Sequence, residues 1–160
     1  MLMRKLILCI LCSFLLLNYA NANEAVFYDT HGNKVQLSLL RGKWVVLNYW
    51  ADWCNACRQE VPELNHFYKK IRDTGIVFYG VDYDDLSPSQ LNTAIETVQI
   101  QYPVLTSDPG LEWNLDNVDA IPTTFILNPE GRVAKVITGA TTEDELLNTI
   151  AALQHARASN

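Results

Sequence analysis

Residues 45–62 read VVLNYWADWCNACRQEVP and form the most informative stretch of the chain. An apolar run rich in valine and aromatic residues ends at Ala51, and two cysteines, Cys54 and Cys57, follow shortly after it. The residues behind the cysteines have the apolar spacing of a helix. The stretch therefore predicts a buried strand that delivers both cysteines to the N-terminus of a helix.

This placement gives the two thiols a specific chemistry. Residues three apart on a helix lie on one face about 5–6 Å apart at Cβ, which a disulfide tolerates, so Cys54 and Cys57 can alternate between dithiol and disulfide. The free N–H groups and the dipole at a helix start favour a thiolate and lower the pKa of Cys54 below the usual value of about 8.5. We expect Cys54 to be the attacking nucleophile and Cys57 to resolve the mixed disulfide.

Strand and helix patterns alternate on either side of this stretch. The strand at 44–49 is apolar at nearly every position, so both of its faces should be buried, and a strand–helix–strand order predicts a parallel pair. Capping boxes at 87–90 and 142–145 mark two helix starts. The predicted elements are two short strands within 26–37, strand 44–49, a helix to about 73 with a kink at Pro62, strand 76–81, helix 88–98, an extended piece at 102–105, a brief helix at 111–115, a hairpin of 123–127 with 133–138, and a final helix after 142.

The first 22 residues have the pattern of a secretory signal peptide. Arg4 and Lys5 precede an apolar run at 6–17, and Ala20-Asn21-Ala22 has the small-residue spacing of a cleavage site. The run is shorter than the roughly 20 residues of a spanning helix, which favours cleavage, with an uncleaved anchor as the alternative. We therefore divide the chain into a signal peptide, 1–22, and one domain, 23–160.

Composition narrows the classes of function for that domain. Loss of residues 1–22 removes two bases and no acid, so the net charge of −6 becomes −8, and no basic patch indicates binding to nucleic acid or anionic membranes. Cys9 and Cys12 lie within the signal segment, so the domain keeps one cysteine pair. A disulfide between Cys54 and Cys57 closes too short a loop to stabilise a fold much, so chemistry explains the pair better than stability.

Three motifs together carry a family resemblance: WADWCNAC at 50–57, RQEVPEL at 58–64 and IPTTFIL at 121–127. The chain resembles the thioredoxin superfamily, in particular the TlpA/ResA-like branch of periplasmic thiol-disulfide oxidoreductases. The resemblance covers essentially the whole domain. It implies a thioredoxin-like α/β fold with a central mixed sheet, helices on both faces, an N-terminal β-hairpin and a strand–helix insert.

The resemblance also assigns substrate-binding residues. Pro122 matches the cis-proline that faces the cysteines in this family and leaves the backbone of Ile121 free to pair with an extended substrate segment. By its residue type alone, Pro122 is equally compatible with an ordinary proline at a strand start. Trp50 and Trp53 match aromatic residues beside the active site, and Trp53 is a candidate substrate contact.

Glu60 is the third candidate catalytic residue, because it matches a carboxylate of the TlpA/ResA-like branch. One turn beyond Cys57, it could exchange protons during thiol attack, or it could be an acid that merely favours the helix dipole. Asn48 stands where many cytoplasmic thioredoxins have a buried aspartate, and an amide cannot titrate. The Asn55-Ala56 dipeptide departs from the proline-containing family versions, which leaves the direction of electron flow open.

The leading functional hypothesis is an exported reductase of protein disulfides in the periplasm, acting as a monomer with protein substrates and an upstream redox partner. A disulfide oxidase or isomerase is the alternative with the same chemistry. A copper metallochaperone using the two thiolates is a third reading. A zinc site is disfavoured because there is no second C-x-x-C and the three histidines are scattered. We expect no cofactor and no resident metal.

Overall fold

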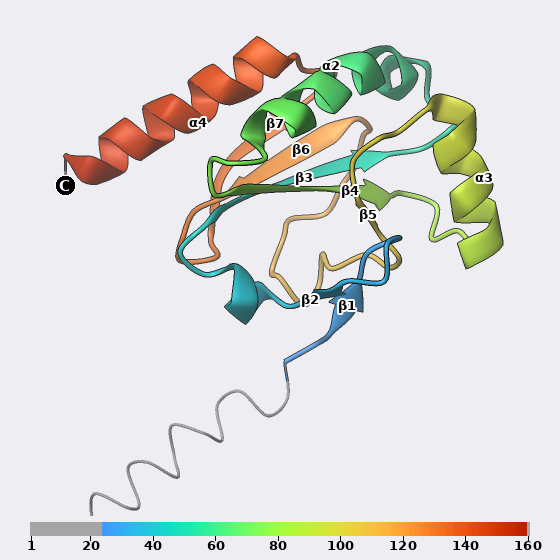
Figure 1. Cartoon of the computed structure of the whole chain (residues 1–160), viewed down its shortest axis with the longest axis horizontal. Coiled ribbons are helices and arrows are strands. Elements are labelled where there is room, and N and C mark those ends of the chain that lie inside the picture. The colour runs from blue at the N-terminus through green and yellow to red at the C-terminus, as the bar shows by residue number, and fades with distance from the viewer. Residues whose placement is uncertain (1–23, 160) are drawn as a thin grey trace, which may run out of the picture.

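The computed structural model describes residues 24–159 as one α/β domain (Figure 1). The predicted signal peptide at 1–22, with Cys9 and Cys12, lies outside the described residues. Within the described range, no helix has both the length and the apolar character needed to cross a bilayer.

A mixed five-stranded sheet is the centre of the domain, in the order β5-β4-β3-β6-β7. The parallel neighbours are β3 with β4 and β4 with β5, whereas β6 runs antiparallel to both β3 and β7. Two further strands, β1 and β2, form the predicted N-terminal hairpin. The strand bounds are β1 Phe27–Tyr28, β2 Lys34–Val35, β3 Trp44–Trp50, β4 Ile76–Asp82, β5 Val104–Leu105, β6 Thr123–Leu127 and β7 Val133–Thr138.

Strand β3 is the predicted strand before the cysteines, and all seven of its residues are buried. Successive side chains of a strand point to opposite faces. Val46 and Trp50 therefore join the core on one face, while Val45 and Tyr49 join the core on the other. A strand buried on both faces needs apolar residues at almost every position, which is the pattern seen in the sequence.

Within residues 24–159 the α-helices are α2 (Asn55–Ile71), α3 (Pro88–Val98) and α4 (Glu143–Ala158), and all contribute to the core cluster that contains Val46. Figure 1 shows α2 and α4 side by side above the sheet. The opposite cluster is covered by the hairpin, the 3-10 helix η1 (Leu37–Leu40) and the loop that carries Trp113. The predicted fold class is confirmed with one difference: η1, not an α-helix, provides the helical cover of the second face.

Helix starts agree well with the capping patterns. Helix α3 begins at Pro88, and the N–H of Ser87 donates to Oε1 of Gln90 at 3.2 Å. Helix α4 begins after Thr142, whose hydroxyl accepts from the N–H of Glu145 at 3.2 Å. Capping works at these positions because the first turn of a helix leaves N–H groups without intrahelical partners.

The predicted helix at 111–115 is wrong. Residues 110–114 form hydrogen-bonded turns, and Asn114 has a left-handed backbone with φ of 53°. The N–H of Trp113 bonds to the carbonyl of Pro109, but that of Leu115 reaches back to Gly110, so the helical pattern stops after one turn. This geometry turns Trp113 into the core against Phe27, with ring centroids 5.8 Å apart.

Candidate active site

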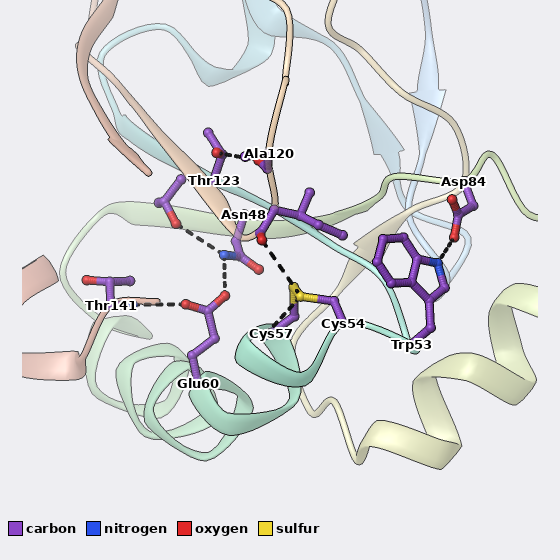
Figure 2. Close-up of a disulfide and its surroundings, with 11 residues drawn as sticks. Asn48, Trp53, Cys54, Cys57, Glu60, Asp84, Ala120, Thr123 and Thr141 are labelled. Atoms are coloured by element: carbon purple, nitrogen blue, oxygen red, sulfur yellow. Dashed lines mark hydrogen bonds between the residues drawn. A yellow bond between two sulfur atoms is a disulfide. The ribbon is translucent and has the colours of Figure 1, made fainter. Parts of the chain in front are cut away.

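The two cysteines form a disulfide at the N-terminus of α2 (Figure 2). Cys54 is the N-cap residue, and the backbone N–H of Cys57 donates to its Sγ over 3.1 Å. The Cα atoms are 5.3 Å apart, and Cys54 keeps 6% exposure against 1% for Cys57. Cys54 is thus the more accessible sulfur, with a donor positioned to stabilise negative charge on it when the pair is reduced.

The Ile121–Pro122 peptide bond is cis, as the family resemblance implied. The carbonyl oxygen of Ile121 is 3.8 Å from Sγ of Cys54. Ile121 is half-buried, whereas Pro122 is buried. A segment sixty-odd residues downstream in the sequence therefore supplies the wall opposite Cys54.

The two tryptophans near the cysteines have different environments. Trp50 is the last residue of β3 and is 1% exposed beneath the site. Trp53 is 61% exposed, and its Nε1 donates to Oδ2 of Asp84 at 2.6 Å. Figure 2 shows Trp53 and Asp84 on the Cys54 side of the disulfide. Trp53 is therefore a surface residue held by a hydrogen bond, and it directly precedes Cys54, the more accessible of the two cysteines.

Glu60 points inward from α2, on the Cys57 side of the disulfide in Figure 2. It is only 2% exposed. Its Oε1 accepts from Nδ2 of Asn48 at 2.8 Å, and its Oε2 accepts from the N–H of Thr141 at 3.0 Å. The carboxyl group thus links α2 to β3 and to the loop before α4, which a solvated first-turn acid would not do.

Burial raises the pKa of Glu60 from 4.5 to about 7, and its hydrogen bonds from Thr141 and Asn48 oppose part of that shift. Desolvation disfavours the charged carboxylate, while the two N–H donors favour it. Because the resulting pKa lies near neutrality, Glu60 can both accept and release a proton under ordinary conditions. Asn48 contributes orientation, since its amide does not titrate.

Two members of this network, Thr124 and Thr141, could not be predicted from the sequence. Thr141 donates to Glu60 from 81 positions away, and the hydroxyl of Thr124 accepts from Nδ2 of Asn48 at 3.1 Å across 76 positions. Both threonines are buried. No local signal marks them, because Thr124 resembles any strand residue and Thr141 acts through its backbone.

The raised pKa of Glu60 makes stability depend on pH. Because the folded protein holds this proton more tightly than the unfolded chain, the stabilisation is fully present below about pH 4.5 and is lost as pH rises through about 7. The shift corresponds to about 3 kcal/mol. Glu60→Gln lacks the titrating carboxyl group. We therefore expect the unfolding free energy of the native protein, relative to that of Glu60→Gln, to fall by about 3 kcal/mol as the pH rises through this range.

Urea unfolding at pH 4.5 and pH 8, with the disulfide intact, measures this difference. Glu96→Gln is a matched control, because Glu96 is exposed on α3. Its unfolding free energy should stay close to that of the native protein at both pH values. If the unfolding free energies of Glu60→Gln and the native protein changed with pH in the same way, the raised pKa assigned to Glu60 would be contradicted.

Among residues 24–159, no group of three or more His, Cys, Asp or Glu side chains is arranged to hold a metal ion. What the site does contain is a disulfide between an accessible and a buried sulfur, a carbonyl beside the accessible sulfur and a buried carboxyl with pKa near 7. These parts are suited to thiol–disulfide exchange.

Comparisons with known proteins agree with this chemistry. The sequence profile of the AhpC/TSA family matches residues 19–136. Thiol-disulfide oxidoreductase ResA from Bacillus subtilis is 34% identical over 124 residues, which make up 78% of this chain and 69% of ResA. A second ResA, from Geobacillus kaustophilus, is 31% identical over 79% of this chain and 72% of its own length.

Solved structures show the same fold. StoA from Bacillus subtilis superposes with a TM-score of 0.63 at 24% identity, covering 78% of this chain and 96% of StoA. A thioredoxin family thiol:disulfide interchange protein from Chlorobium tepidum gives a TM-score of 0.62 at 26% identity, over 78% and 90% of the two chains. The chain therefore belongs to the AhpC/TSA family and, within it, to the thioredoxin-like thiol-disulfide oxidoreductases of the ResA type.

Proposed function

We propose that this protein reduces disulfide bonds in other proteins outside the cytoplasm. The observation that carries the proposal is the asymmetry of the pair: Cys54 caps α2 beside Ile121 and is the more accessible cysteine, while Cys57 is almost completely buried. Disulfide reduction through a mixed disulfide needs one thiol that meets the substrate and a second that stays within reach of the first.

In the proposed cycle the protein starts as the dithiol. The Cys54 thiolate attacks one sulfur of the substrate disulfide, that S–S bond breaks, and the departing substrate sulfur takes up a proton. Cys57 then loses its proton and attacks Sγ of Cys54, which releases the second substrate sulfur as a thiolate that is protonated in turn. The substrate gains two electrons and two protons, and the Cys54–Cys57 disulfide is formed. An upstream dithiol protein must return the pair to the reduced state.

Glu60 is proposed as the proton carrier of the second step. Cys57 is buried and must lose a proton before it attacks, so a nearby base with a pKa near neutrality is suited to the task. Asn48 and the N–H of Thr141 hold the carboxyl in one orientation. Glu60 is therefore assigned to the transfer of the proton rather than to substrate binding.

Substrate binding is assigned to Ile121, Pro122 and Trp53. The backbone of Ile121 lies beside the reactive sulfur, and an extended segment paired with it would present a cystine to Cys54. Trp53 offers an exposed aromatic surface next to that path. Pro122 has no backbone N–H, so it cannot donate a hydrogen bond that competes with the substrate segment.

The compartment is proposed from the N-terminal segment. The signal-peptide pattern of residues 1–22 supports export to the periplasm, where a reductase would act on proteins that other enzymes oxidise.

We propose a monomer, since each chain contains both cysteines and the cis-proline segment.

The reduction potential of the Cys54–Cys57 couple tests the direction of electron flow. Equilibration with glutathione buffers should give a value more negative than about −200 mV, and the reduced protein should reduce insulin. A clearly less negative value would assign the protein to disulfide oxidation or isomerisation. Absence of any exchange with insulin or glutathione would exclude both directions.

A further inference from the structure

Three large apolar side chains stand exposed around the disulfide end of the sheet. Trp53 is 61% exposed, Tyr83 is 43% exposed and Leu111 is 90% exposed. The N–H of Tyr83 donates to the carbonyl of Trp50 at 2.9 Å, which fixes Tyr83 at the end of β3 where the active-site turn begins. Exposed apolar groups at the end of the sheet that carries the active-site turn indicate a surface that another molecule covers.

A hollow of about 310 Å³ lies beside two of these residues. Tyr83 and Leu111 line it together with Asp108, Asp116 and Val118. Ile121 follows Val118 by three residues in the chain, and its carbonyl oxygen is 3.8 Å from Sγ of Cys54. The loop that lines the hollow therefore leads directly into the segment beside Cys54.

The charges on this surface have a single sign. The segments 49–57, 82–90 and 106–122 contain eight of the chain's 18 acidic residues and no Lys, Arg or His, and the neighbouring cation is the exposed Arg58, directly after Cys57. The eight acids are Asp52, Asp82, Asp84, Asp85, Asp108, Glu112, Asp116 and Asp119. Both salt bridges found among the described residues, Lys70–Glu143 and Arg157–Glu130, involve none of them.

Some of these acids have carboxylate oxygens with no hydrogen-bond partner among the described residues, one of them buried and two exposed. Asp82 is 8% exposed, and its Oδ1 has no hydrogen-bond partner, although its Oδ2 accepts from the N–H of Leu86. Asp116 and Asp119 are exposed in the loop that leads to Ile121. We call the surface formed by Trp53, Tyr83 and Leu111 with Asp84, Asp85, Asp108, Asp116 and Asp119 the acidic rim.

We propose that the acidic rim selects protein substrates in which Lys or Arg side chains flank the disulfide. The inference rests on the proposed reductase function and names its substrate class. A substrate must approach Cys54 across the rim, where a negative field attracts cations and speeds encounter. Trp53 and Tyr83 can stack against guanidinium or ammonium groups, while Leu111 and the hollow accept an apolar neighbour.

Three synthetic peptides test this selection. They share one length and one central cystine loop, and the residues that flank the loop are Lys, Gln or Glu. The rate constant for reduction by the dithiol form of the protein should be at least about tenfold higher for the Lys peptide than for the Glu peptide at low ionic strength. The ratio should shrink towards one at about 0.5 M salt, because screening shortens the range of the field.

Two double variants distinguish an effect of the acidic rim from an effect of the protein's net charge. Asp116→Asn with Asp119→Asn removes two rim charges, and Asp73→Asn with Glu96→Gln removes two charges from exposed positions at the C-terminal ends of α2 and α3. Neither pair touches the cysteines or Glu60. The rim pair should lower the preference for the Lys peptide severalfold, whereas the control pair should leave it unchanged. An equal loss in both pairs would overturn the proposal.

The remaining outcomes are also decisive. Equal rates for the three peptides, or a faster Glu peptide, would overturn the selection while leaving the reductase function intact. No reduction of any peptide, with no reduction of insulin, would instead refute the proposed function. A dimer in sedimentation that Leu111→Ser dissociates would assign the rim to a second copy of the chain and overturn its role in substrate selection.

Discussion

Replacing Cys54 with serine is expected to lower the rate of disulfide reduction on the order of 10³-fold or more, because the substrate then meets no nucleophilic thiolate. Cys57 cannot substitute for it, since only 1% of that residue is exposed. The measurement is insulin reduction under steady supply of a dithiol donor. Gln59→Ala is the control, because Gln59 is exposed two residues after Cys57 and should retain the native rate within about twofold.

Replacing Cys57 with alanine should give a different result from the loss of Cys54. The first attack still occurs, but no second thiol resolves the product, so a substrate should stay covalently bound to Cys54. Non-reducing electrophoresis and mass spectrometry would detect one substrate chain per protein, released by dithiothreitol. A Cys54→Ser protein that remains active, or a Cys57→Ala protein that accumulates no mixed disulfide, would contradict the assigned roles.

Replacing Phe67 with alanine is expected to lower the free energy of unfolding by about 3–5 kcal/mol. Phe67 is fully buried in α2, and its ring meets Phe78 of β4 edge to face with centroids 5.5 Å apart. The loss combines the transfer of apolar surface to water with the cavity left between helix and sheet. Since domains are stable by only about 5–15 kcal/mol, this single change would remove a large part of the total.

Urea denaturation at one fixed pH, with the disulfide intact, measures the loss. His66→Ala is the matched control, because His66 neighbours Phe67 on the same helix but is exposed, and its loss should stay within about 0.5 kcal/mol. A loss below about 1 kcal/mol for Phe67→Ala would show that the contact between α2 and β4 contributes little to stability.

Local patterns in the sequence predicted most of the secondary structure. The capping residues and proline of α3 were enough to give its start at Pro88, because capping depends on groups within four residues of one another. The strand β3 could be recognised from its continuous apolar run. The error at 111–115 has the opposite cause: there the burial of Trp113 against Phe27, far away in sequence, accompanies a left-handed Asn114 that no local pattern specifies.

The candidate site also contains residues that the sequence predicted and residues that it did not. The chemistry of Cys54 and Cys57 follows from their spacing and from the helix start beside them, both of which are readable in the sequence. The family resemblance added Pro122 and Glu60. It did not supply the partners of Glu60, because Asn48 and Thr141 meet it only when β3 and the loop before α4 pack against α2.

The sequence by itself determined the nucleophile, the resolving thiol and the order of strands and helices, since these depend on residue type and short spacings. The tertiary structure alone decided how deeply Glu60 is buried, which groups hold its carboxyl and where the acidic rim lies. Desolvation and electrostatic fields are produced by all atoms around a group, whatever their position in the chain. A property that depends on such surroundings becomes defined only when distant segments have come together.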